Sequence, residues 1–199
     1  SVVLHPREPQ FAALVGEGLR VDTLSCWDWE TGRELFRVEG DEQLLHAAYS
    51  PLGSYLFFSR AAYDSLVALD PGTGRSLPYM RRGFGIVSYF TIARNETNIL
   101  TYQPSGTLAY WEIRSGKNLR QLQTLPGLEG IEISGNNRFA AAVSADELVV
   151  VDLLSGEPTA RARAVGLAAL TLSADGNQVT AIGADASDAL REAGGSGGR

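Results

Sequence analysis

A motif of eleven residues occurs four times along this chain at nearly constant spacing. Each copy has a short apolar run, an acidic residue, and a glycine four positions after the acid; the copies span residues 22–32, 64–74, 106–116 and 146–156. The steps between their closing glycines are 42, 42 and 40 residues. A period of this length is typical of arrays of repeated supersecondary units. The chain is therefore expected to fold as a row of stacked units within one domain.

The second unit shows the pattern most clearly. Residues 45–49 alternate as a half-buried strand does and lead into a turn at 50–53 that contains Pro and Gly. Apolar runs at 55–58 and 66–69 are short and rich in strand-forming residues, and 77–80 is a less regular fourth candidate. Four short strands separated by turns indicate an all-β fold.

The same order of strands and turns predicts four complete units and an incomplete fifth. Their expected limits are about 1–40, 44–82, 86–125, 128–165 and, for the partial unit, 167–183. Residues 184–199 are expected to form a C-terminal tail, either a short helix or a flexible segment, because the chain ends in a Gly-Ser-rich sequence. A third strand starting near residue 188 is the alternative for the beginning of this tail.

Units of about 40 residues that end in a Trp-Asp-like pair resemble the WD-repeat blades of β-propellers. The matching pairs are Trp27-Asp28, Leu69-Asp70, Trp111-Glu112 and Val151-Asp152. The resemblance covers residues 1–183 and implies blades that are four-stranded antiparallel sheets. The repeats are degenerate, because the family's Gly-His pair is missing and two of the four tryptophans are replaced. With only His5 and His46 in the chain, the family's buried hydrogen-bond relay is not expected in its usual form.

Four repeated positions have an expected structural role. Leu24, Leu66, Leu108 and Leu148 form a row that we expect between blades, and Trp27, Leu69, Trp111 and Val151 form a second row. The acid after the second row is expected to accept hydrogen bonds from backbone N–H groups of the following turn. The glycine four positions later is expected to adopt a positive φ.

The number of units raises the question of closure. A propeller ring has 4–8 blades, and this sequence contains four units and a fragment. Either the chain is part of a larger propeller, or a partner covers its open ends, or it forms a small closed ring. The first two possibilities are favoured over the third.

Composition restricts the class of partner. The chain has 17 basic and 23 acidic residues, a net charge of −6, which disfavours nucleic-acid binding. Its apolar runs are shorter than a membrane span, so membrane insertion is not expected. The single Cys26 excludes an internal disulfide framework and is compatible with a reducing compartment, which favours an intracellular, cytoplasmic location.

The sequence offers little chemistry. The acids Asp28, Asp70, Glu112 and Asp152 recur once per unit, so they are expected to lie far apart and to serve turns. His5 and His46 have no partner arrangement that would identify a nucleophile and a base. Cys26 is expected to behave as a small buried hydrophobe. No catalytic, cofactor-binding or metal-binding residue is therefore expected, and the chain is not expected to be an enzyme.

One segment stands out as a candidate partner contact, in the connection between the second and third units. It contains Tyr79, Met80, Arg81, Arg82 and Phe84, and aromatic and arginine side chains dominate interface energies. The alternative is a solvated loop from which Phe84 packs inward. The leading functional hypothesis is a non-catalytic protein–protein interaction scaffold within a multi-subunit complex. The alternative is a propeller enzyme or a small-ligand-binding protein that uses the central channel.

Overall fold

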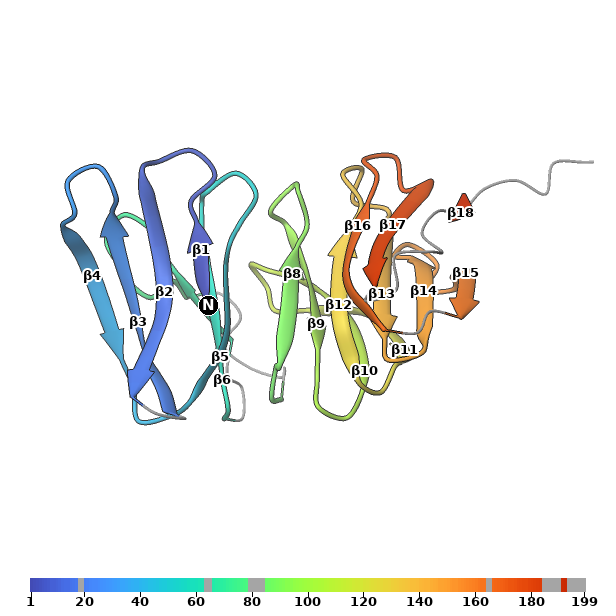
Figure 1. Cartoon of the computed structure of the whole chain (residues 1–199), viewed down its shortest axis with the longest axis horizontal. Helices are drawn as coiled ribbons and strands as arrows, with labels where there is room; N and C mark the ends of the chain where they lie inside the picture. Colours follow the sequence, from blue (N-terminus) through green and yellow to red (C-terminus); the bar gives the residue numbers. More distant parts are fainter. Residues whose placement is uncertain (18–19, 63–65, 79–84, 164–165, 184–190, 193–199) are drawn as a thin grey trace, which may run out of the picture.

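The computed structural model describes residues 1–17, 20–62, 66–78, 85–163, 166–183 and 191–192. Within these residues the regular structure is entirely β, and within each sheet consecutive strands pair antiparallel. The sheets stand side by side, with the N-terminal sheet at one end of the molecule and the C-terminal sheet at the other (Figure 1). The predicted all-β class with antiparallel sheets is confirmed.

Five separate sheets form the molecule, and we name them units 1 to 5 in chain order. Unit 1 contains β1 (Val2–Leu4), β2 (Gln10–Glu17), β3 (Arg20–Asp28) and β4 (Glu34–Glu39). Unit 2 contains β5 (Leu44–Tyr49), β6 (Leu56–Arg60) and β7 (Leu66–Leu69). Unit 3 contains β8 (Tyr89–Ile92), β9 (Asn98–Tyr102), β10 (Thr107–Glu112) and β11 (Asn118–Thr124). Unit 4 contains β12 (Leu128–Ile133), β13 (Phe139–Ser144), β14 (Glu147–Asp152) and β15 (Pro158–Arg163). Unit 5 contains β16 (Leu167–Leu172), β17 (Gln178–Gly183) and β18 (Arg191–Glu192).

Two expected segments differ from the prediction. The fourth strand predicted at 77–80 is not a strand at its described residues 77 and 78; instead Ser76 forms a single bridge with Leu69. The short helix considered for the C-terminal tail is not found at residues 191 and 192, which form β18 and pair with β17. Unit 5 therefore has a third strand, and the rest of that tail lies outside the described residues.

The repeated acid–glycine turn has the same backbone hydrogen bonds in all four copies. The glycine N–H donates to the carbonyl of the acid at 2.7–2.9 Å in the pairs Gly32–Asp28, Gly74–Asp70, Gly116–Glu112 and Gly156–Asp152. All four glycines have φ between +67° and +83°, as expected, because an L side chain rarely adopts that conformation. The side chains of the three aspartates also accept backbone N–H groups of the turn. Glu112 differs, since its carboxylate bonds the Ser115 hydroxyl.

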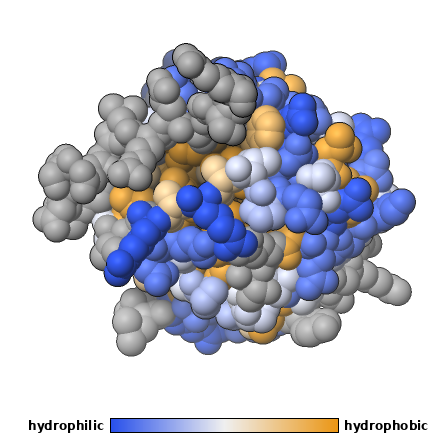
Figure 2. All heavy atoms as spheres, turned by 90° about the vertical axis from the view of Figure 1, so that its right-hand side faces the viewer, coloured by the Kyte–Doolittle hydropathy of each residue, from blue (hydrophilic) through white to orange (hydrophobic). Residues whose placement is uncertain are grey.

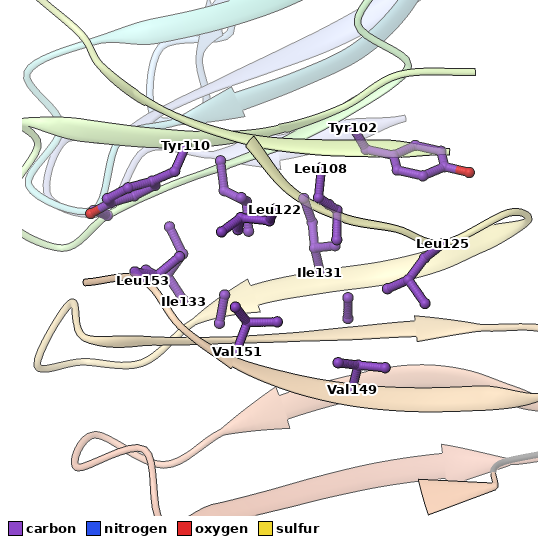
Figure 3. Packing of buried hydrophobic residues seen from close by; sticks show 14 residues of the cluster. Tyr102, Leu108, Tyr110, Leu122, Leu125, Ile131, Ile133, Val149, Val151 and Leu153 are labelled. Atoms are coloured by element: carbon purple, nitrogen blue, oxygen red, sulfur yellow. The ribbon is translucent and has the colours of Figure 1, made fainter. Parts of the chain in front are cut away.

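The two sides of each sheet pack against different neighbours. Side chains alternate between the faces of a strand, so the two repeated rows point in opposite directions. Leu24, Leu66 and Leu108 are buried against the following unit, and Leu148 is half-buried there. The other row packs against the preceding unit, where Leu69, Trp111 and Val151 are 2–6% exposed. Figure 3 shows one such core, the cluster between units 3 and 4.

Hydrogen bonds also join consecutive units at the turn between their first and second strands. His5 Nε2 lies 3.1 Å from the Gly53 carbonyl, so unit 1 is tied to unit 2. The Glu96 carboxylate accepts the Leu52 N–H at 2.7 Å, joining units 2 and 3. The remaining links are Asn95 N–H to Asn137 Oδ1 and Asn136 Nδ2 to the Asp175 carbonyl. This series of links joins all five units through adjacent turns.

Candidate functional site

The predicted contact segment of Tyr79, Met80, Arg81, Arg82 and Phe84 lies outside the described residues. Its role as a partner contact remains a prediction. The described residues instead present a different candidate site, the side of unit 1 that faces away from unit 2. We call this surface the open face of unit 1.

The open face consists of side chains that alternate along each strand with the buried core residues of unit 1. Val3, Ala12, Leu24, Cys26 and Phe36 pack toward unit 2. Because the strand period is two residues, their neighbours point to the opposite side. The register places these neighbours in three rows: Leu4–Phe11–Trp27, Val2–Ala13–Ser25–Arg37, and Val15–Thr23–Glu39. The first two rows begin with apolar side chains from β1 and continue across the sheet.

Several large apolar groups of the open face are exposed to solvent. Val2 and Leu4 are 65% and 66% exposed, and Val15 is 44% exposed. Phe11 and Trp27 are half-buried and stack on each other, with ring centroids 5.2 Å apart. Strong ionic groups are confined to the outer strand, where Arg37 pairs with Glu34 and Glu39. The surface is therefore apolar and aromatic near β1 and becomes polar toward β4.

The opposite end of the molecule has a different character. On unit 5, the side away from unit 4 carries exposed Gln178 and Thr180, and Ile182 there is 65% exposed. Figure 2 views the molecule from this end and shows hydrophilic and hydrophobic residues interspersed around the grey segments. The described residues thus present a surface at unit 1 that is apolar and aromatic near β1, and a more polar surface at unit 5.

A pocket of about 260 Å³ lies against the first strands of several units. Its lining includes Val3, His46, Pro51, Tyr89, Phe90 and Ile131. His46 stacks on Tyr89 with ring centroids 4.1 Å apart and meets the edge of Phe90 at 4.8 Å. Burial lowers the pKa of His46 to about 4, although a hydrogen bond with the Phe90 backbone opposes the shift. The imidazole is therefore neutral near pH 7 and presents an apolar, aromatic wall.

The other candidate chemical groups have structural surroundings. The ring of His5 is buried; its Nδ1 accepts the Glu8 N–H at 2.8 Å, so Nε2 carries the proton donated to the Gly53 carbonyl. Cys26 is fully buried, and desolvation raises the pKa of its thiol, only partly offset by Tyr49. The described residues contain no cluster of three or more potential metal ligands. Nor do they include a helix able to cross a lipid bilayer.

The structural role of His5 could not be read from the sequence, where the residue was only a turn position. The one signal is the residue opposite it: a side chain at Gly53 would come within 2.5 Å of the imidazole. The open face had a clearer signal. The alternation in β1 leaves Val2 and Leu4 on one side and Val3 on the other.

Comparison with known proteins gives the family. The model of a family described as TP_0598_N, N-terminal beta-propeller domain, matches residues 1–173. The match covers most of the chain, so the protein belongs to this β-propeller family. A comparison with curated proteins finds no match.

Solved structures with the same fold include the Kuenenia stuttgartiensis hydrazine synthase. The TM-score is 0.72 at 15% sequence identity, over 90% of this chain and 54% of that one. At this identity the likeness shows the fold alone. This chain spans about half the length of the matched hydrazine synthase chain.

Proposed function

We propose that this member of the N-terminal β-propeller domain family is a non-catalytic protein–protein interaction scaffold, a WD-repeat-like half propeller within a larger multi-subunit assembly. The observation that carries the proposal is the open face of unit 1. A sheet with an apolar face is stable in water when a second layer covers it. In units 2 to 4 the preceding unit covers that face, whereas Val2 and Leu4 of unit 1 remain about two-thirds exposed.

The proposed occupant is another propeller blade, from a partner or from further sequence of the same protein. Such a blade would present the row that Leu24, Leu66 and Leu108 form here, because that row packs on each following unit. Burial of apolar surface contributes about 25 cal/mol per Å², so covering two rows of aliphatic and aromatic side chains favours association. The partners we propose are proteins, since the net charge of −6 opposes a nucleic-acid surface.

The WD-repeat character is part of this proposal. Its support is the Trp-Asp-like pair that ends the third strand of each of the first four units, followed by the same glycine turn. The degenerate positions are Leu69 and Val151, where tryptophan is replaced by smaller apolar residues in the same buried row.

The test measures whether the open face is covered in the native assembly. Hydrogen exchange of the β1–β3 amides is compared between the isolated 199-residue chain and the protein purified from its source in complex. The proposal expects slower exchange of the β1 amides in the complex. Equal exchange in both preparations would remove the proposed role of this face.

A matched pair of variants sharpens the test. Leu4→Asp places a charge on the open face and is expected to dissociate the assembly while the isolated chain keeps its melting temperature. Leu52→Asp makes the same change at a leucine of unit 2 that is 42% exposed and lies outside the open face, and it is expected to leave the assembly intact. An assembly that survives Leu4→Asp would contradict the proposal.

A second candidate function is small-ligand binding in the pocket near His46, whose stacked His46 and Tyr89 rings suit a flat apolar ligand. It is tested by titration of indole with the wild-type chain and His46→Ala. Saturable binding that weakens in the variant supports it, and absence of saturable binding by the wild type contradicts it.

A further inference from the structure

A second hollow lies on the outer side of the molecule, between units 3 and 4. It has a volume of about 440 Å³ and is lined by Tyr110, Leu119, Arg120, Asn137, Arg138, Leu153 and Leu154. Residues from β10 and β11 form one wall. The turn before β13 and the turn after β14 form the other. We call this hollow the rim groove. It is separate from the open face of unit 1.

The walls of the rim groove are held in place by contacts between the two units. Arg120 donates from Nε and Nη2 to the Leu154 carbonyl at 3.2 and 3.1 Å. Gly156, at φ +83°, lies so near β11 that an added Cβ would be 3.5 Å from the Arg120 side chain. The groove is therefore formed before any ligand binds, which lowers the entropic cost of binding.

The groove combines exposed apolar groups with positive charge. Leu154 is 75% exposed and Leu119 is 36% exposed, one from each wall. Arg138 bonds Asp152, whose side chain is only 12% exposed, yet the arginine itself is 60% exposed. Arg120 makes no ion pair with a carboxylate among the described residues. No acidic residue is among those that line the groove.

One polar group at the base of the groove is also without a partner. Tyr110 is 7% exposed, and within the described part of the chain its hydroxyl makes no hydrogen bond. The hydroxyl points away from the apolar cluster in Figure 3, beyond Leu153. Burial raises the pKa of Tyr110 to about 12, so the hydroxyl keeps its proton and is a hydrogen-bond donor at neutral pH.

We propose that the rim groove binds an acidic segment of a partner protein that inserts an apolar side chain between Leu119 and Leu154. Two guanidinium groups and a hydroxyl donor face this space, and charge-assisted bonds from arginine favour carboxylates. The chain as a whole has a net charge of −6, so the positive charge of the groove is a local feature and not part of a generally basic surface. This local charge favours an acidic occupant.

The test uses short fluorescein-labelled peptides and the full 199-residue chain. One peptide has glutamates flanking a pair of leucines; the second has lysines in place of the glutamates, and the third has serines in place of the leucines. Saturable binding by the first peptide only, measured by fluorescence polarisation, is the expected result. Equal binding by the serine peptide, or by a single-stranded oligonucleotide, would show a general anion site and overturn the proposal.

Variants locate the binding. Arg120→Glu is expected to weaken binding of the acidic peptide by about tenfold or more, because it turns an attraction into a repulsion. Leu154→Ser is the second variant; its side chain is mostly exposed, so folding should be unaffected while the apolar contact is lost. Arg33→Glu makes the same charge change on an exposed arginine of unit 1 and serves as the control. Unchanged affinity in both Arg120→Glu and Leu154→Ser would refute the rim groove as the site.

Discussion

Units 1 and 3 carry equivalent rows of three apolar residues in the same register, but the row of unit 1 faces solvent and that of unit 3 is buried. In unit 1 the row is Leu4–Phe11–Trp27, and in unit 3 it is Ile92–Ile99–Trp111. Leu4 is 66% exposed, while Ile92, Ile99 and Trp111 are 7%, 0% and 6% exposed. The difference comes from the neighbour: unit 2 covers the row of unit 3, and no described residue covers that of unit 1. Residue type therefore reflects the place in the repeat, and burial reflects the presence of a preceding unit.

The comparison is tested most strongly by placing a charge in each row. Ile92→Asp is expected to destabilise the chain by at least about 3 kcal/mol, because an unpaired charge would be buried in the core. Leu4→Asp is expected to cost less than about 0.5 kcal/mol in the isolated chain, as exposed substitutions do. Urea denaturation followed by circular dichroism measures both. Similar losses in the two variants would mean that the row of unit 1 is already covered.

The two tryptophans provide a second test, without an introduced charge. Trp111→Ala is expected to cost about 3–5 kcal/mol, the usual range for a buried aromatic truncation. Its Nε1 also donates to Thr101 Oγ1 at 2.9 Å, a bond that the variant loses. Trp27→Ala, which removes a half-buried ring, is expected to cost roughly 1 kcal/mol. Chemical denaturation of the two variants gives the difference, and a loss below about 1 kcal/mol for Trp111→Ala would contradict its burial.

These rows also show what the sequence could predict. Periodicity identified the two leucine and tryptophan positions as repeated rows, and the acid–glycine spacing predicted the turns with positive φ. The sequence could not predict which row faces the preceding unit, because alternation defines two faces without assigning neighbours. Nor could it predict the rim groove, where Arg120 meets residues more than 30 positions later in the chain. The candidate contact at residues 79–84 stays a prediction.

The links between units escaped prediction for a different reason. Gly53, Glu96, Asn137 and Gly176 occupy the same turn position, since all have φ between +55° and +85°. Their side chains are chemically unlike, so no repeated letter marks the position. Glu96 adopts a conformation unusual for its type, and its carboxylate bonds the N–H groups of Leu52 and Ser54. The role of this turn position in linking units becomes visible only when two units are placed side by side.

The third prediction compares Glu96 with Glu8. Each glutamate lies three residues after the start of the turn between the first and second strands of its unit, but Glu8 is exposed. Burial alone would raise the pKa of Glu96, but hydrogen bonds from Ser50, Leu52 and Ser54 outweigh it and lower the pKa. A lowered folded-state pKa stabilises the fold above the unfolded value of about 4.3 and loses that contribution as pH falls through the folded value.

Glu96→Gln is therefore expected to cost about 1 kcal/mol at pH 7, from weaker hydrogen bonds, and much less at acidic pH. Glu8→Gln serves as the control and is expected to leave stability unchanged at neutral and at acidic pH. Urea midpoints at pH 7 and pH 3 measure the effect. An equal cost of Glu96→Gln at the two pH values would rule out an ionised Glu96 as the link between units 2 and 3.

In the smallest expected effect unit 1 is the better-bonded one, because the side chain of its turn acid accepts a backbone N–H of the turn and that of unit 3 does not. Asp28 Oδ1 accepts the Thr31 N–H at 2.8 Å, and hydrogen bonds from Thr31 lower the pKa of Asp28. The carboxylate of Glu112, one methylene longer, accepts the Ser115 hydroxyl, and among the described residues it accepts no backbone N–H of its turn. Glu112→Asp is therefore expected to stabilise the chain by about 0.5 kcal/mol, the low end for a net hydrogen bond. Thermal melting compares it with Glu112→Asn, which tests the geometry without the charge; a lower melting temperature for both would show that the Ser115 contact matters more than the missing turn bond.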